Sequence, residues 1–203
     1  MGSLEPSGDI GGVHDREWAR LGRPGTWFTA TQRVEIAAAA RGGETTSPAQ
    51  IAARQIYTDP AAIRRDWLAD LEADGLTLAE YVEVLGIVAR LRAFDTLLFG
   101  LGSAVRPLPP ARSEAPPTRV RVDATINGAW VPTVGIAFPP TVLSSVPAEN
   151  EAMHDVHSVL YLAPTPATDG HSMGNLRAAR DGITRPQMEF IAARTSQLND
   201  CFF

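Results

Sequence analysis

An all-α fold is what the amino-acid sequence predicts, and two observations carry this prediction. Helix-start signals recur along the chain, because Thr29, Thr77 and Thr184 are each followed three residues later by Gln or Glu, the pattern of a capping box. Apolar residues follow each signal at the three- and four-residue spacing of a helix face. Each of these three points is therefore expected to begin a helix.

The other elements follow in order from similar signals. A short amphipathic segment is expected at 15–21, and glycines at 42–43 and 75 end two of the later helices. The stretches 120–126 and 130–134 could be short strands, but nearby prolines favour irregular structure. The longer helices are expected at about 30–40, 48–56, 60–73, 78–100 and 147–162, followed by the one that begins after Thr184.

Composition and charge exclude several classes of function. The net charge is −5 and all basic residues are arginine, so there is no basic footprint for nucleic acid or for an acidic membrane surface. The most apolar stretch, 81–101, contains Glu83, Arg90 and Asp95, which argue against a membrane span. The carboxylates of this helix, Glu80, Glu83 and Asp95, are expected to lie on a solvated flank.

Cysteine usage and the N-terminus predict the compartment. A single cysteine excludes an internal disulfide framework and favours a reducing environment. Residues 1–12 have no apolar core of the kind that a secretory signal needs. A cytoplasmic location is therefore expected.

The segment 184–203 holds the clearest chemical signal in the chain. The helix that begins at Thr184 is interrupted at Asn199-Asp200, which offers an N-cap for a further helix start. Cys201 would then lie in a first helical turn, where backbone amides and the helix dipole favour the thiolate. This placement predicts that Cys201 is a nucleophile.

This segment resembles the active-site segment of the alkylhydroperoxidase AhpD-like (carboxymuconolactone decarboxylase) family, which reads E-x11-C-x-x-C-x-x-x-H. Glu189 and Cys201 match the family's carboxylate and first cysteine, and Ser196 and Asn199 lie in register between them as supporting residues. The resemblance implies an AhpD-like helical fold and a homo-oligomer. It also implies a peroxidase that reduces hydroperoxides with a thiol reductant or redox protein, in which Glu189 relays protons and Cys201 belongs to the redox pair.

The second cysteine and the histidine of the family pattern would fall at the first and fifth positions after Phe203. Some members of the family carry selenocysteine in place of one cysteine, and its codon is ordinarily read as a stop. The sequence is therefore interpreted as a selenoprotein cut short at Cys-x-x-Sec, with Cys201 as the resolving thiol and no turnover as a dithiol peroxidase. A frameshift or a natural non-catalytic paralogue would also explain this ending.

A weak internal repeat supports a tandem arrangement. A shift of 155 residues places Thr29 on Thr184 and leaves a valine and a threonine where Glu189 and Cys201 stand, so the first copy lacks the chemistry. The expected segments are a flexible N-terminal arm at 1–26, a degenerate AhpD-like unit at 27–102, a Pro-rich linker or irregular segment at 103–146, and an incomplete second unit at 147–203.

Other functions remain open at this point. A non-catalytic helical scaffold that oligomerises, or a decarboxylase that acts on a lactone without a cysteine pair, would fit the same fold. His154 and His157 lie one turn apart near Glu149, Glu151 and Asp155, a spacing that could hold a metal. A solvated acidic helix is the favoured interpretation, so neither a metal nor a cofactor beyond the redox-active groups is expected.

Overall fold

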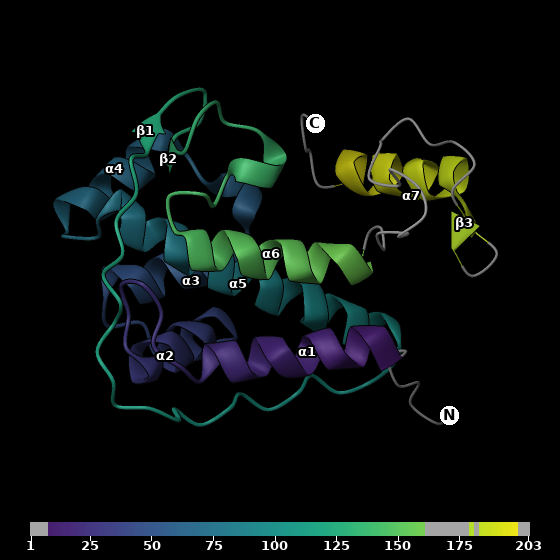
Figure 1. The fold of residues 1–203 in the computed structure, drawn as a ribbon, viewed down its shortest axis with the longest axis horizontal. Coiled ribbons are helices and arrows are strands. Elements are labelled where there is room, and N and C mark those ends of the chain that lie inside the picture. Colours follow the sequence, from purple (N-terminus) through teal and green to yellow (C-terminus); the bar gives the residue numbers. More distant parts are fainter. Residues whose placement is uncertain (1–7, 161–178, 181–182, 199–203) are drawn as a thin grey trace. The chain divides into compact units, whose positions relative to one another are not determined.

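The computed structural model describes residues 8–160, 179–180 and 183–198 of the chain, and Figure 1 shows their fold. The chain divides into two compact units, Met1–Val159 and Leu160–Phe203. The described residues are mostly helical, and their strands are only two residues long. The all-α prediction is confirmed at this level.

Six α-helices and a two-stranded ribbon make up the described part of the first unit. The helices are α1 (Gly8–Leu21), α2 (Ala30–Ala40), α3 (Pro48–Thr58), α4 (Arg65–Ala73), α5 (Leu78–Gly100) and α6 (Pro147–Leu160). The ribbon pairs β1 (Thr125–Ile126) with β2 (Pro132–Thr133) in antiparallel register, and short 3-10 turns lie at Pro60–Ala62 and Pro139–Thr141.

The long helix α5 is the centre of the first unit, and α1, α2 and α3 pack against it (Figure 1). Its Val82, Val88 and Phe94 are fully buried, as are Ile36 of α2 and Val13 of α1. The helix starts follow the predicted signals, since the Thr29 and Thr77 hydroxyls cap α2 and α5 in complete capping boxes. The bounds of α2 and α5 agree with the sequence prediction.

The N-terminal helix differs from the prediction. It begins at Gly8 instead of Asp15, and Val13 and Trp18 are only 2% and 6% exposed. Helix α1 therefore packs into the core through these side chains and is not a flexible arm. Burial of these side chains outweighs the low helix propensity of the three glycines in its first five residues.

The expected helix at 60–73 is broken. A 3-10 turn at Pro60–Ala62 is followed by extended backbone at Ile63 and Arg64, and α4 begins only at Arg65. The Arg64 guanidinium donates to the carbonyls of Ala61 and Ile63, which satisfies the acceptors that a continuous helix would have used.

The Pro-rich segment is a wrapped loop. Its backbone N–H groups donate to the turn between α1 and α2: Arg112 to Gly22 O at 2.8 Å, and Thr118 to Gly25 O at 3.0 Å. The Trp18 indole closes the other end by donating to Pro107 O at 2.7 Å. These bonds place the segment in the first unit, against the turn that precedes α2.

Helix α6 also belongs to the first unit, so the division of the chain lies at 159/160 rather than at the predicted 146/147. In the second unit the described elements are β3 (Ala179–Arg180), β4 (Ile183–Thr184) and α7 (Arg185–Leu198). Within the described ranges, no helix has the length and apolar character that crossing a membrane requires.

Candidate functional site

Helix α7 carries the two predicted site residues that the structure describes. It starts at the predicted capping box, where the Gln187 side chain accepts from the Thr184 backbone at 2.8 Å. Glu189 lies in the second turn and Ser196 in the last, while Asn199 and Cys201 lie outside the described residues. The spatial relation of Glu189 to Cys201 therefore stays a prediction.

Glu189 and Ser196 lie on the same side of α7. They are two turns apart, and both are half-buried, as are Met188 and Ala192, whereas most other α7 side chains are exposed. Arg185, only 1% exposed, forms an ion pair with Glu189, whose side chain is 38% exposed. The carboxylate is thus oriented by a buried guanidinium and remains accessible to solvent.

A second face of α7 is apolar and exposed. Phe190 and Ile191 are 76% and 56% exposed, and with Ile183, Pro186 and Gln187 they line an open groove. Most of the apolar surface of this helix is therefore turned away from the side that carries Glu189.

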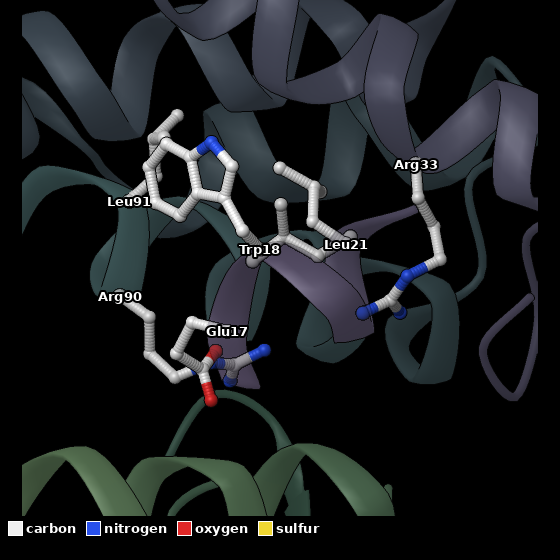
Figure 2. Close-up of a pocket in the computed structure, with 7 residues that line it drawn as sticks. Glu17, Trp18, Leu21, Arg33, Arg90 and Leu91 are labelled. Carbon is white, nitrogen blue, oxygen red and sulfur yellow. The ribbon is translucent and has the colours of Figure 1, made fainter. Parts of the chain in front are cut away.

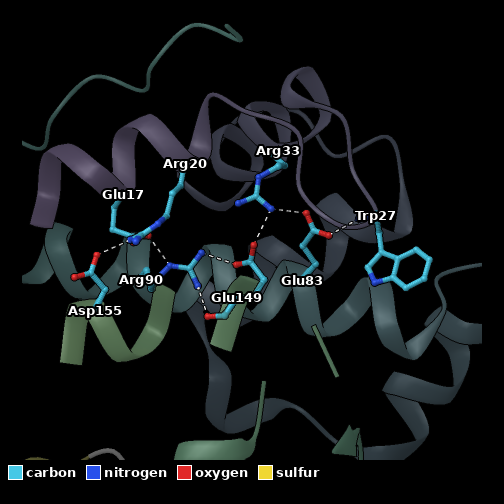
Figure 3. A network of polar contacts seen from close by, with 8 residues as sticks. All are labelled: Glu17, Arg20, Trp27, Arg33, Glu83, Arg90, Glu149 and Asp155. Atoms are coloured by element: carbon cyan, nitrogen blue, oxygen red, sulfur yellow. Dashed lines mark hydrogen bonds and ion pairs between the residues drawn. The ribbon is translucent and has the colours of Figure 1, made fainter. Parts of the chain in front are cut away.

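The first unit contains a charged network that the sequence analysis missed, shown in Figure 3. At one end, Arg33 of α2 forms ion pairs with Glu83 of α5 and Glu149 of α6, and all three are at most 3% exposed. The Trp27 backbone N–H also donates to Glu83, at 2.6 Å. Glu83 was expected to lie on a solvated flank, and this expectation is wrong.

At the other end of the network, Arg90 of α5 binds carboxylates from two further helices. Its Nε donates to Glu17 of α1 at 2.6 Å, and its Nη2 donates to Glu149. Arg20 joins Glu17 to the half-buried Asp155 of α6 at the surface. Four helices are thereby linked, and Arg33 and Glu149 alone lie 116 residues apart in sequence.

The two buried carboxylates of α5 and α6 respond differently to this environment. Burial favours protonation of Glu149, but Arg33 and Arg90 together outweigh it and lower its pKa to about 2. For Glu83, burial dominates over the attraction of Arg33, and its pKa is raised. Glu149, held by two guanidinium groups, is therefore the more firmly ionised member.

Two glycines make room for the network. A Cβ at Gly25 would lie 2.0 Å from Glu83 Oε1, and one at Gly86 would lie 2.7 Å from Glu149 Oε2. Both distances are too short for a real contact, so a side chain at either position would displace a buried charge. The backbone at Gly25 and Gly86 therefore forms the space that the two carboxylates occupy.

A second polar cluster ties α2, α3 and α5 together. Arg41 binds Asp95 through two nitrogens, and the Tyr57 hydroxyl donates to the same carboxylate at 2.8 Å. Asp95 is 3% exposed, which again differs from the expected solvated flank. His14 stacks on Phe94 nearby, and burial, reinforced by Arg106, lowers the pKa of this histidine to about 4.

The α6 residues that could have formed a metal site are directed elsewhere. Glu149 lies in the buried network, and Asp155 pairs with Arg16 and Arg20. The His154 imidazole lies 3.1 Å from Pro140 O. In the part of the chain that the structure describes, no group of three His, Cys, Asp or Glu side chains is placed to hold a metal ion.

A signal for the buried network was present in the sequence. Glu83 and Arg90 stand seven residues apart within a mostly apolar helix, on one face of it, and charges in such a position need partners. The partners could not be named, because Arg33 and Glu149 come from helices far away in sequence. The Arg41–Asp95 pair was hidden for the same reason.

Comparisons with known proteins give no match. No protein-family model, no curated protein and no solved structure is significantly similar to this chain. A function for this protein must therefore be argued from its own residues and their arrangement.

Proposed function

We propose that the protein is a thiol- or selenol-dependent oxidoreductase of the AhpD-like type that reduces hydroperoxides. The spacing of Glu189, Ser196, Asn199 and Cys201 is the observation that carries this proposal. Helix α7 supports it, because the helix begins at the expected residue and presents Glu189 and Ser196 on one half-buried side. The tandem arrangement and homo-oligomer belong to the same proposal.

The reaction divides between a nucleophile and a proton donor. The attacking thiolate or selenolate forms a bond to the terminal peroxide oxygen, the O–O bond breaks, and the alkoxide or hydroxide leaves with a proton supplied through Glu189. The attacking atom is oxidised by two electrons. A second thiol then condenses with it, releases water and forms a disulfide or selenylsulfide, which an external thiol reductant reduces.

Arg185 has a positioning role in this scheme. Its buried guanidinium holds one side of the Glu189 carboxylate, while the exposed part of that carboxylate can exchange protons with solvent. An oriented and accessible carboxylate is what a proton relay needs. Ser196, two turns further along the same side, would support the segment that leads to Cys201.

The test is the reactivity of the Cys201 thiolate at neutral pH, which both the attacking and the resolving role require and which does not need complete turnover. The full chain is treated with iodoacetamide at pH 7, and the alkylated residue is located by mass spectrometry. We expect labelling of Cys201 that is at least tenfold slower in Glu189→Gln, with Glu151→Gln as the matched control on an exposed helix position. Labelling no faster than in the urea-unfolded chain would refute the proposal.

A non-catalytic scaffold is the second candidate, and exposed apolar side chains on the first unit favour it. Around the β1–β2 ribbon five of them are more than 40% exposed: Ile126, Trp130, Val134, Ile136 and Phe138. Such a concentration in thirteen residues is typical of an interaction surface. Sedimentation velocity of the wild type and of an Ile136→Ser, Phe138→Ser variant tests this, since a scaffold should lose its oligomeric state and keep its fold.

A further inference from the structure

The pocket beside the charged network is too small for a substrate or a cofactor. Its volume is about 20 Å³, and its walls include Glu17, Trp18 and Leu21 (Figure 2). A pocket that binds a small organic ligand normally has about 300–1,000 Å³. A partner of the first unit that is larger than a few atoms must therefore bind elsewhere, and the surface beside β1 has the features of a binding edge.

The backbone that leads into β1 has a free edge. In the part of the chain that the structure describes, no hydrogen bond joins the backbone of residues 120–123 to another group. Strand β1 pairs with β2 on one side, and no described strand covers its other side. All but one of residues 119–126 are exposed, and Figure 1 shows the chain running along the outside of the first unit towards β1. An unpaired edge of this kind is a template for another strand.

The ends of this edge are set by the backbone. Arg119 has a φ of 55°, in the left-handed region that residues other than glycine rarely adopt, and Gly128 follows β1 with a φ of 82°. Between these two turns, residues 120–126 contain no proline and include four β-branched side chains. Seven residues of this composition match an ordinary β-strand in length and in propensity.

The side chains of the edge already alternate as they do in a strand. The Arg119 and Arg121 guanidinium carbons both lie over the Trp27 ring, at 5.7 and 5.6 Å from its centre. Side chains two residues apart on one side are the period of an extended backbone. Val120 and Val122 fall on the opposite side, and they are 50% and 37% exposed. The edge therefore needs little rearrangement to accept a partner strand.

The charges of the edge are complementary to those of a second copy. In an antiparallel pair with a twofold axis at Val122, Arg121 of each copy lies opposite Asp123 of the other, and Val120 lies opposite Ala124. An axis at Arg121 or at Asp123 would instead place two like charges opposite each other. Opposite charges across two strands are stabilising and like charges are destabilising, so the charges select the register centred on Val122.

We propose that residues 120–126 are a dimerisation edge, to which the same segment of a second copy of this chain adds in antiparallel orientation around Val122. The pairing satisfies the free backbone groups and joins two β1–β2 ribbons into one continuous sheet, in an interface that is identical for both copies. The proposal concerns the first unit and does not depend on the redox chemistry assigned to α7. Its failure would therefore leave that assignment unaffected.

A change of one charge tests the interface in solution. Sedimentation equilibrium of the full chain should show a dimer of the wild type. Asp123→Arg places arginines opposite each other in the selected register, and we expect it to raise the Kd of the dimer at least about tenfold. Asp70→Arg makes the same change of charge at an exposed position of α4 and should leave the Kd unchanged. A monomeric wild type, or equal effects of the two variants, would overturn the proposal.

An exchange of charges tests the register. Arg121→Asp should weaken the dimer as Asp123→Arg does, because two aspartates then lie opposite each other. The double variant Arg121→Asp, Asp123→Arg restores opposite charges and should dimerise again. A mixture of the two single variants should form heterodimers for the same reason. If the wild type dimerises and neither combination restores pairing, the contact lies elsewhere and the proposal is wrong.

Amide hydrogen exchange tests the backbone pairing without any substitution. In an antiparallel pair every second residue of an edge bonds to the partner strand. We expect alternate amides of residues 120–124 to exchange more slowly as the concentration of the wild-type chain rises, and to stay fast in Asp123→Arg at the same concentration. Exchange at these amides that does not depend on concentration would contradict the proposal, whatever the fold of the charge variants.

Discussion

Two of the charged clusters in the described part of the chain are built in opposite ways. In the first unit, the network around Arg33 and Glu149 joins four helices and is almost completely buried. On α7, Arg185 and Glu189 are four residues apart in one helix, and the carboxylate is 38% exposed. The buried network depends on the fold and supports it, whereas the pair on α7 leaves a carboxylate available for chemistry.

Removing one carboxylate from each place should give the largest contrast. Glu149→Ala leaves Arg33 and Arg90 without a shared partner in the interior, and we expect it to reduce the free energy of unfolding by about 3–5 kcal/mol. Glu189→Ala removes a partly exposed pair and should cost about 1 kcal/mol or less. Urea unfolding of the full chain, followed by circular dichroism, measures both. Equal losses would show that the two places do not differ in this way.

Glycines that contact the buried carboxylates should differ from a glycine with free space around it, which gives a second, smaller contrast within the first unit. Gly25→Ala and Gly86→Ala bring a Cβ against Glu83 and Glu149, and we expect each to cost about 1–3 kcal/mol, as overpacking of an interior does. Gly11→Ala lies in α1 with nothing within 4 Å of the new atom, and should stabilise by about 0.5–1 kcal/mol. Thermal denaturation measures whether each variant loses or gains stability. A tolerated alanine at both Gly25 and Gly86 would mean that the carboxylates can move.

The pH dependence of stability should distinguish the two buried carboxylates of the network. The lowered pKa of Glu149 means that its ionised form stabilises the fold above about pH 4.5, and that this contribution is lost as the pH falls from 4.5 towards 2. The raised pKa of Glu83 has the opposite sign, so its contribution is present below 4.5 and is lost as the pH rises through its folded value.

Glu149→Gln should therefore destabilise more than Glu83→Gln at pH 7, and its penalty should shrink below pH 4.5. Urea midpoints measured from pH 3 to pH 7 for the wild type and both variants give this comparison. A larger penalty for Glu83→Gln at pH 7 would show that Glu83 is the more strongly stabilised anion.

The smallest expected effect concerns the helix caps, which occur in both places. Thr29→Ala removes the cap of α2, which is packed in the core, and should reduce the free energy of unfolding of the first unit by about 1 kcal/mol. Thr184→Ala removes the hydrogen bond that the Thr184 hydroxyl donates to the Gln187 side chain, and should fray α7 without changing the unfolding of the first unit. Amide hydrogen exchange measures the protection of α2 and α7 separately. A change in the protection of α2 in Thr184→Ala would contradict the expectation that this variant affects only α7.

Local interactions explain what the sequence could predict. The starts of α2, α5 and α7 follow from a hydroxyl and a side chain three residues later, and the end of α2 follows from Gly42, whose φ is +111°. These capping interactions act within one helical turn, so they can be recognised without knowing the fold. The motif residues on α7 can be recognised for the same reason.

Long-range packing explains what the sequence could not predict. The full length of helix α1 has no local signal, because Val13 and Trp18 are held by residues of other elements, and the burial of Glu83 follows from an arginine 50 residues away. Glu149 lies in a helix whose acidic composition predicts solvation, although its partners come from α2 and α5. No local pattern identifies which distant charges will meet.

The position of α6 in the chain has a consequence for synthesis on the ribosome. Arg33 and Arg90 are made early, but Glu149, the carboxylate they share, is made 49 residues after the end of α5 at Gly100. At about 5–20 residues per second, that interval lasts roughly 2–10 s. During this time the nascent helices α1 to α5 hold two guanidinium groups that lack their common anion, and folding of the unit is completed only when α6 emerges.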